Sequence, residues 1–317
     1  MTASNTPIAL ITGGSRGLGK NTALHLAAQG GDIILTYRSA KAEAEATVAA
    51  IQAQGCRAVA LQLDTSISAS FSAFASSVQQ ALPETFQRDR FDHLVNNAGE
   101  GRHASIMETT EAQFDDLVNM HLKGVFFLTQ KLVPLMNDGG RIVNISSGLT
   151  RFALPGYGAY AAMKGAVEVL SRYMAKELGE RGIAVNTIAP GAIETDFGGG
   201  AVRDNAQLNA FVAAQTALGR VGLPDDIGGA IAALLALRLH DDRRRREISR
   251  HRQAARRVDA VPAIRTDGVG SDHGAQVGTR GQYDSVGVGT AGDEAPGVGG
   301  TSLADNILPK LQSADGR

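Results

Sequence analysis

The chain has 317 residues, of which 43% are hydrophobic, and its formal net charge is −1. This length can bury one large core, and the near-neutral charge gives no reason to expect a nucleic acid as the main partner. Cys56 is the only cysteine, and neither a signal peptide nor a run of roughly 18 apolar residues occurs, so we expect a cytoplasmic protein without disulfides or a membrane partner.

Short apolar segments alternate with longer amphipathic segments as far as about residue 237. The strand candidates read as almost continuous apolar sequence, as strands buried on both faces do: residues 8–12, 33–38, 58–63, 93–96, 141–146 and 184–189. The helix candidates lie near residues 17–29, 40–54, 68–82, 111–136, 157–181 and 225–237. This alternation predicts a doubly wound α/β fold, a parallel sheet of Rossmann type with helices on both faces.

The first strand leads directly into a glycine-rich turn and then into a helix. The turn reads Thr12-Gly13-Gly14-Ser15-Arg16-Gly17-Leu18-Gly19. Glycines let the backbone turn tightly and approach a pyrophosphate, and the helix N-terminus offers unpaired N–H groups. Any glycine-rich turn can join a strand to a helix, but a dinucleotide site needs this strand–turn–helix context. The turn therefore predicts a dinucleotide cofactor.

The second strand ends in Arg38 and Ser39, with no carboxylate there. In Rossmann sites an acidic residue at this position binds the ribose 2′-hydroxyl of NAD, whereas an arginine accommodates a 2′-phosphate. Arg16 in the glycine turn adds a second guanidinium, a group that suits phosphate. Solvated surface arginines are the alternative interpretation. The pattern favours NADP(H) over NAD(H).

Tyr160 and Lys164 lie four residues apart in an Ala-rich segment, so a helix brings both side chains to one face. A free tyrosine has a pKa of about 10, and a nearby ammonium together with the positive nicotinamide ring of an oxidised cofactor is expected to lower it. Ser147 ends the fifth strand, where its hydroxyl can donate to a substrate oxygen. Together these residues predict proton transfer to a carbonyl oxygen, coupled to hydride transfer from a nicotinamide.

These segments resemble, in order and spacing, the motifs of the short-chain dehydrogenase/reductase family. The matching motifs are Thr-Gly-x3-Gly-x-Gly at 12–19, Asn-Asn-Ala-Gly at 96–99, Ser-x12-Tyr-x3-Lys ending at Lys164, and Pro-Gly at 190–191. The resemblance is greatest to NADPH-dependent ketoreductases related to 3-oxoacyl-carrier-protein reductase. This resemblance implies an enzyme that interconverts a small-molecule carbonyl and a secondary alcohol without a metal. It also implies a homo-oligomer, either a dimer or a tetramer.

The family resemblance also implies roles for single residues. Lys164 would bind the ribose hydroxyls, and Asp64 would contact the adenine amino group, cap the helix that follows, or do both. Thr195 would contact the nicotinamide amide, and Ile193 would offer backbone groups to the nicotinamide ring. The full set expected to bind the cofactor is Thr12, Gly13, Ser15, Arg16, Gly17, Leu18, Gly19, Arg38, Ser39, Asp64, Asn96, Ala98, Gly99, Tyr160, Lys164, Pro190, Gly191, Ile193 and Thr195.

One position departs from the family pattern. Many members have an asparagine in a Val-Asn-Leu-Lys-Gly segment, where it holds a water for proton relay. Here residues 118–124 read Val-Asn-Met-His-Leu-Lys-Gly, and aligning Leu-Lys-Gly puts His121 at that position and Asn119 two residues earlier. A neutral imidazole can also hold a water, so His121 is favoured over Asn119 as a catalytic residue. An interior histidine without a part in the chemistry is the alternative.

The substrate side of the site has weaker signals. Residues 197–221 contain Gly198-Gly199-Gly200 and predict a mobile lid. Phe152, Leu154 and Tyr157 are expected to form an apolar wall. No charged residue in these segments identifies a particular substrate.

The family pattern stops after Leu237. Nine arginines lie between residues 238 and 257, followed by Gly-, Asp- and Val-rich sequence, which predicts a catalytic domain over 1–237 and a disordered tail over 238–317. The family's seventh strand has no match here. Three interpretations explain the tail: an evolved extension, a partner-binding segment or out-of-frame translation. The abrupt change in composition after Leu237 favours out-of-frame translation. A catalytically impaired or non-catalytic dinucleotide-binding relative is therefore the alternative function.

Overall fold

The computed structural model describes residues 6–236, which form a six-stranded parallel sheet in the order β3-β2-β1-β4-β5-β6. The strands are β1 (Ile8–Ile11), β2 (Asp32–Tyr37), β3 (Ala58–Gln62), β4 (Phe91–Asn96), β5 (Met136–Ile145) and β6 (Ala184–Ile188). The predicted doubly wound α/β fold is confirmed. The predicted tail and the question of a seventh strand lie outside the described residues.

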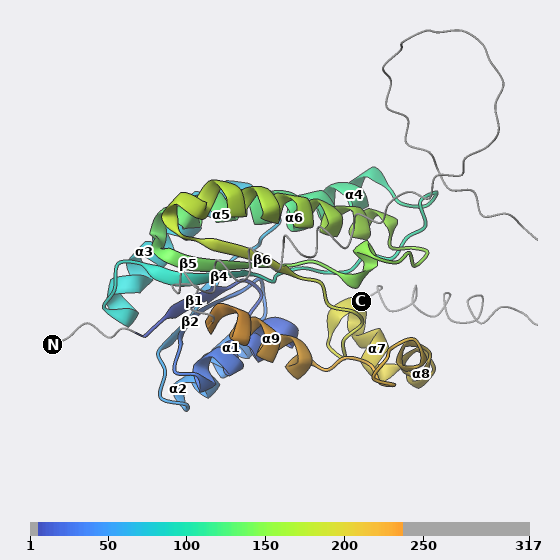
Figure 1. Cartoon of the computed structure of the whole chain (residues 1–317), viewed down its shortest axis with the longest axis horizontal. Helices are drawn as coiled ribbons and strands as arrows, with labels where there is room; N and C mark the ends of the chain where they lie inside the picture. Colours follow the sequence, from blue (N-terminus) through green and yellow to red (C-terminus); the bar gives the residue numbers. More distant parts are fainter. Residues whose placement is uncertain (1–5, 237–317) are drawn as a thin grey trace, which may run out of the picture. The chain divides into compact units, whose positions relative to one another are not determined.

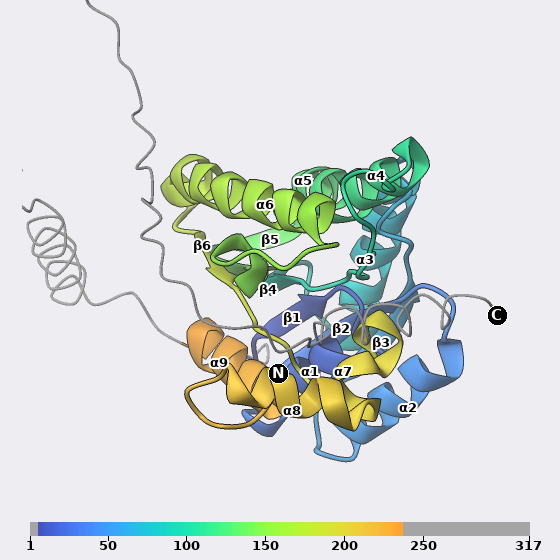
Figure 2. The same cartoon turned by 90° about the vertical axis from the view of Figure 1, so that its right-hand side faces the viewer.

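Helices cover both faces of the sheet (Figures 1 and 2). One face carries α1 (Gly17–Ala28), α2 (Lys41–Gln52) and α9 (Pro224–Ala236), and the other carries α3 (Phe71–Phe86), α5 (Gly124–Leu132) and α6 (Gly158–Glu177). Successive residues of a strand point to opposite faces. In β1, Ile8 and Leu10 pack into the core beneath α3 and α5, whereas Ala9 and Ile11 pack beneath α1 and α9. This double burial explains the uninterrupted apolar character of the strands.

Shorter helices complete the described chain. They are η1 (Ser68–Ser70), α4 (Glu111–Leu117), η2 (Val118–Lys123), η3 (Val133–Leu135), η4 (Gly148–Thr150), η5 (Leu178–Arg181), η6 (Phe197–Gly200), α7 (Ala201–Asp204) and α8 (Ala206–Ala214). The segments η6, α7 and α8 occupy the predicted lid region, on the α1 side of the molecule (Figure 2). Within residues 6–236, no helix is both long and apolar enough to span a membrane.

Two predicted boundaries differ from the structure. The helix predicted over 111–136 is divided by the π-helical turn η2, and α5 ends at Leu132 because Pro134 follows. β5 begins at Met136, five residues before the predicted start, although Asn137-Asp138-Gly139-Gly140 has the composition of a turn. A Cβ on Gly140 would lie 2.6 Å from the Asp92 oxygen, so a glycine is needed for the close approach to β4.

Candidate active site

The turn between β1 and α1 depends on three glycines. Gly13 and Gly17 have φ angles of 65° and 55°, which residues with a side chain rarely adopt. A Cβ on Gly19 would lie 2.2 Å from the Gly13 oxygen, so no larger residue fits there. In the described chain, no side chain caps the first turn of α1 and no acidic residue lies in it. Its N–H groups and the positive end of its dipole therefore suit the diphosphate of a dinucleotide.

Thr12 and Asn97 join this glycine turn to the loop after β4. The Thr12 hydroxyl oxygen accepts hydrogen bonds from the backbone N–H groups of Asn97 and Ala98, at 2.9 and 3.0 Å. In return, the Asn97 side-chain amide donates to the Thr12 and Gly13 oxygens, at 2.9 and 3.1 Å. The two loops thus form one unit. Asn97 was absent from the predicted site, although it lies within the Asn-Asn-Ala-Gly motif that could have identified it.

The Asn96 side chain points into the interior of the fold from the carboxyl end of β4. Its side chain is buried and donates to the Thr129 hydroxyl at 3.0 Å and to the Asn144 side-chain oxygen at 2.8 Å. Asn144 in turn donates to the Ser171 hydroxyl at 2.8 Å. These bonds connect β4 and β5 with α5 and α6. The Asn96 side-chain N–H groups therefore stabilise the interior, because both of their hydrogen bonds are made there and not to the glycine turn.

A basic residue, and not an acidic one, follows the end of β2. Arg38 is exposed there, with its Nη1 atom 3.4 Å from Oε2 of Glu100. Asp32, the acidic residue of β2, lies at the opposite end of the strand. It is buried, and its carboxylate accepts from the Arg57 guanidinium at 2.6 Å. Asp32 therefore has a structural partner far from the glycine turn.

Three further predicted residues lie in the loops after β1, β2 and β3. Arg16 and Ser39 are both exposed. Asp64 is half-buried, and its Oδ1 accepts hydrogen bonds from the N–H and the hydroxyl of Ser66, at 2.9 and 2.6 Å. One carboxylate oxygen of Asp64 thus stabilises a local turn before η1.

Ser147, Tyr160 and Lys164 meet at the carboxyl end of β5. Tyr160 and Lys164 lie buried on one face of α6, with the lysine Nζ 5.5 Å from the tyrosine ring centroid. Lys164 Nζ also donates to the backbone oxygen of Ile145, at 2.9 Å. Ser147, two residues after Ile145 in the chain, is also buried, and its Oγ accepts a hydrogen bond from the Leu149 N–H at 3.2 Å. The predicted spacing therefore brings the three side chains together.

Burial dominates the ionisation of this group. It raises the pKa of Tyr160 well above its ordinary value, while the hydrogen bond with Ser147 acts in the opposite direction. Burial also lowers the pKa of Lys164 to about 8. In the chain by itself the pKa of Tyr160 is raised, because lost hydration of the phenolate outweighs the hydrogen bond with Ser147.

His121 lies beside Tyr160. The two rings meet edge to face, with centroids 5.2 Å apart. His121 Nε2 lies 2.8 Å from the backbone oxygen of Glu100, which requires a proton on Nε2. The Nδ1 atom is buried and has no hydrogen-bond partner among residues 6–236. Asn119, the alternative, accepts instead from Lys123 Nζ at 3.1 Å on the exposed side of η2.

The pKa of His121 is about 3, because burial and the charge of Lys164 both disfavour the imidazolium. The ring is therefore neutral near pH 7. A neutral imidazole with a protonated Nε2 presents Nδ1 as a hydrogen-bond acceptor.

The segment after β6 approaches both halves of the site. The Pro190 oxygen accepts from the Gly148 N–H at 2.7 Å, next to Ser147 in the chain. Thr195 is buried, and its Cβ lies 3.7 Å from the position of a Cβ on Gly17. The residues between Pro190 and Thr195 include the predicted Gly191 and Ile193. This segment therefore connects the glycine turn with the Ser147 loop.

Aromatic side chains border Tyr160 on the predicted substrate side. The Phe197 ring centroid lies 6.0 Å from that of Tyr160. Tyr157 packs edge-on against His103, with centroids 5.1 Å apart. Phe152, in the loop before α6, is 58% exposed. Glu100, His103 and Phe197 had no individual predicted role, because their positions depend on loops that are irregular in sequence.

The sequence is similar to a family of reductases. Residues 13–238 match a family model described as enoyl-(acyl carrier protein) reductase. The 3-oxoacyl-[acyl-carrier-protein] reductase of Synechocystis sp. is 37% identical over 238 residues, which cover 74% of this chain and 91% of that protein.

Solved structures with similar folds include two ketoreductases. The reductase LugOII, described as catalysing keto-reduction at C1 during lugdunomycin biosynthesis, is 36% identical with a TM-score of 0.69, over 74% of this chain and 92% of that one. The angucycline C-6 ketoreductase LanV, solved with bound NADP, is 31% identical with a TM-score of 0.69, over 72% of this chain and 88% of that one.

The Rossmann sheet and these relatives define an oxidoreductase. More narrowly, the chain belongs to the short-chain dehydrogenase/reductase family, as its sequence motifs predict.

Proposed function

We propose that this protein is an NADP(H)-dependent oxidoreductase that interconverts a small-molecule carbonyl and a secondary alcohol. The observation that carries this proposal is the burial of Tyr160 between Ser147 and Lys164, at the end of the sheet that holds the glycine turn. Such a site can protonate a substrate oxygen away from bulk water.

Each of these residues has a distinct role in the proposed reaction. When bound, the nicotinamide cofactor supplies the hydride for reduction and accepts it in oxidation. The Tyr160 hydroxyl donates its proton to the carbonyl oxygen as negative charge develops there. Because burial raises the pKa of Tyr160, the hydroxyl is protonated at neutral pH, as an acid must be. Ser147 donates a hydrogen bond to the same oxygen.

Lys164 and His121 would support Tyr160. Lys164 Nζ lies 5.5 Å from the tyrosine ring, where a protonated amine favours the phenolate left after proton transfer. His121 presents a neutral Nδ1 beside the same ring. With a pKa of about 3, this nitrogen is suited to holding a water by accepting its hydrogen bond, and not to taking up a proton itself. We therefore retain His121, and not Asn119, as the relay candidate.

The preference for NADP(H) is proposed from the residues around the glycine turn. Arg38 is exposed after β2, and the acid of that strand, Asp32, is paired with Arg57 at the other end. A 2′-phosphate would therefore meet a guanidinium and no competing carboxylate from β2. Arg16, at the start of α1, supplies a second exposed guanidinium. That LanV was solved with NADP supports the same preference.

The proposed function is tested by two measurements on the full-length chain. Calorimetric titration with NADPH and NADH should give saturable binding that is tighter for NADPH. Tyr160→Phe should lower ketone turnover by at least about 100-fold, because it removes the proton donor, while NADPH binding persists. Tyr173→Phe, on the exposed side of α6, is the matched control and should keep full turnover.

The possible outcomes separate the two candidate functions. Full turnover in Tyr160→Phe contradicts the catalytic assignment. NADPH binding without turnover of any ketone in a broad panel instead supports the alternative, a non-catalytic dinucleotide-binding relative.

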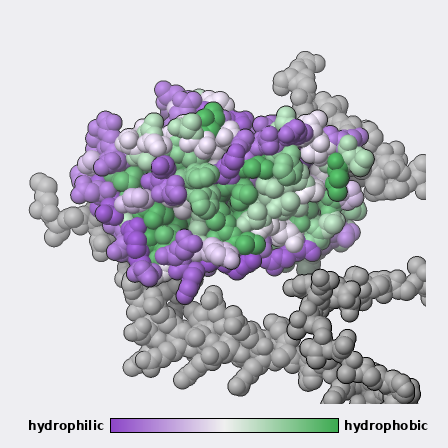
Figure 3. Space-filling model, turned by 90° about the horizontal axis from the view of Figure 1, so that it is seen from above, coloured by the Kyte–Doolittle hydropathy of each residue, from purple (hydrophilic) through white to green (hydrophobic). Residues whose placement is uncertain are grey.

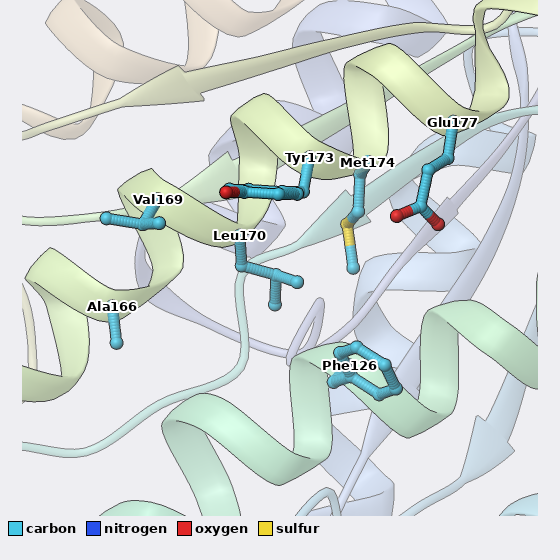
Figure 4. Close-up of a pocket in the computed structure, with 7 residues that line it drawn as sticks. All are labelled: Phe126, Ala166, Val169, Leu170, Tyr173, Met174 and Glu177. Atoms are coloured by element: carbon cyan, nitrogen blue, oxygen red, sulfur yellow. The ribbon is translucent and has the colours of Figure 1, made fainter.

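We also propose that the protein forms homo-oligomers through α5 and α6. Exposed apolar side chains gather over these helices, and the hydrophobic area occupies the middle of this face in Figure 3. A groove on it is lined by Phe126, Ala166, Val169, Leu170, Tyr173, Met174 and Glu177 (Figure 4). A second copy pairing about a two-fold axis would bury the same face on both chains.

A further inference from the structure

Glu100 lies at the centre of a small charged network in the loop after β4. Its carboxylate is 3.4 Å from the Arg38 guanidinium and 3.1 Å from that of Arg102. Arg102 also pairs with Asp116 at 3.5 Å. The Glu100 side chain is 34% exposed and that of Arg38 is 55% exposed, so both can exchange partners without unfolding the loop.

The order of the strands places the Arg38–Glu100 ion pair across the glycine turn. β1 lies between β2 and β4 in the sheet. Arg38 follows β2, Glu100 follows β4, and the glycine turn follows β1. Ala98, two residues before Glu100, has its Cα 3.0 Å from the position of a Cβ on Gly13. The ion pair therefore connects the loops on either side of the turn where a dinucleotide would bind.

We propose that Glu100 competes with the 2′-phosphate of NADPH for Arg38, and so determines how strongly the protein binds and selects this cofactor. This inference rests on the proposed NADP(H) function. A carboxylate and a phosphate use the same guanidinium donors. While Arg38 Nη1 contacts Glu100, that donor is not available to the phosphate. The negative charge of Glu100 also repels a phosphate placed beside it.

Arg102 makes this exchange possible at low cost. When Arg38 turns to the phosphate, Glu100 retains its contact with Arg102 at 3.1 Å. The carboxylate is then not left unpaired in a half-buried position, which would oppose binding more strongly. Glu100 thus weakens NADPH binding moderately and does not prevent it.

Glu100→Gln tests the proposal directly. The substitution keeps the size of the side chain, and His121 contacts only the backbone oxygen of residue 100, so that contact is preserved. We expect the Kd for NADPH, measured by calorimetry, to fall by about fivefold, the range for one exposed ion pair. The Kd for NADH should change by less than about twofold, because NADH has no 2′-phosphate to bind Arg38. An unchanged or higher Kd for NADPH would overturn the inference.

Matched variants assign the effect to Arg38. Asp116→Asn removes a carboxylate that contacts Arg102 but not Arg38, and it should leave the Kd for NADPH unchanged. In an Arg38→Ala background, Glu100→Gln should no longer tighten NADPH binding; a full effect there would contradict the proposal. Glu100→Ser is the second variant if thermal unfolding shows that Glu100→Gln does not fold.

The same titrations separate this inference from the proposed function. If the wild-type chain binds neither cofactor, or if Arg38→Ala leaves NADPH binding unchanged, the NADP(H) function fails and the inference fails with it. If Arg38→Ala weakens NADPH binding but Glu100→Gln has no effect, only the role of Glu100 fails.

Discussion

Burial, more than charge pairing, controls the titratable side chains around Tyr160. Tyr160 and Lys164 shift in opposite directions because each loses hydration of its charged form: the pKa of the phenol rises and that of the amine falls. His121 and His93 follow the same rule, with pKa values of about 3 and 4. At neutral pH the site therefore combines a protonated tyrosine with a neutral histidine.

Because the pKa values of His121 and His93 are lowered in the folded chain, we expect the protein to lose stability in acid. Between pH 6.5 and their folded pKa values, the unfolded chain binds protons that the folded chain does not, so the free energy of unfolding falls as the pH falls. Each contributes a slope of about 1.4 kcal/mol per pH unit within that window. His121→Asn should therefore reduce this slope by about 1.4 kcal/mol per pH unit, measured by urea unfolding from pH 6 to pH 4.5. Equal slopes in both proteins would contradict the lowered pKa of His121.

Among structural elements, the glycine turn tolerates little change of sequence. Gly19→Ala puts a methyl group 2.2 Å from the Gly13 oxygen and 2.6 Å from the Asn97 side-chain nitrogen. We expect the turn to shift, NADPH affinity to fall by at least about tenfold, and stability to fall by about 1–3 kcal/mol. Calorimetric titration and urea unfolding measure these two effects.

Gly229→Ala is the matched control for that turn. It lies inside α9, where an added Cβ would be 3.7 Å from the nearest neighbouring atom, in the His25 ring. Alanine favours a helix interior by about 1 kcal/mol over glycine, so this variant should be at least as stable as the wild type and should bind NADPH equally. If both alanine variants behave alike, crowding at Gly19 is not the cause.

The helix over 111–136 shows where local pattern is insufficient. Its apolar periodicity correctly indicates helix, but the π-helical turn η2 has no signal in composition. A Cβ on Gly124 would lie 2.4 Å from the Thr65 oxygen, and His121 reaches the Glu100 oxygen from the same turn. Both contacts involve residues distant in sequence, so periodicity within the helix could not predict them.

At the scale of the whole molecule, the apolar face of α5 and α6 predicts self-association. Tyr173, which is 65% exposed, lies on this face (Figure 4). Tyr173→Glu would place a charge in the paired interface, which is costly without a partner. We expect the variant to sediment as a smaller species than the wild type in analytical ultracentrifugation. Phe211→Glu, at an exposed aromatic on α8, should keep the wild-type oligomeric state. A monomeric wild-type protein would contradict the proposal.

Much of the fold and candidate site was predictable from sequence. The six strands, the glycine turn and the grouping of Tyr160 with Lys164 depend on patterns within short segments: apolar runs, φ angles open to glycine, and a four-residue helical spacing. Such patterns can be recognised without knowing which residues the segment contacts in the folded chain. The boundaries of β5 and α5 were less predictable because neighbouring strands and loops decide them.

Only the tertiary structure decided how the site residues interact. It turned Asn96 into the sheet interior, raised the pKa of Tyr160 through burial, and brought Glu100 to Arg38 across the glycine turn. Each result depends on side chains that are far apart in sequence and meet because β1 lies between β2 and β4 or because α6 packs on the sheet. The hydration of a side chain and its interaction with charges both depend on which groups surround it in space. The residue types alone therefore do not determine these interactions.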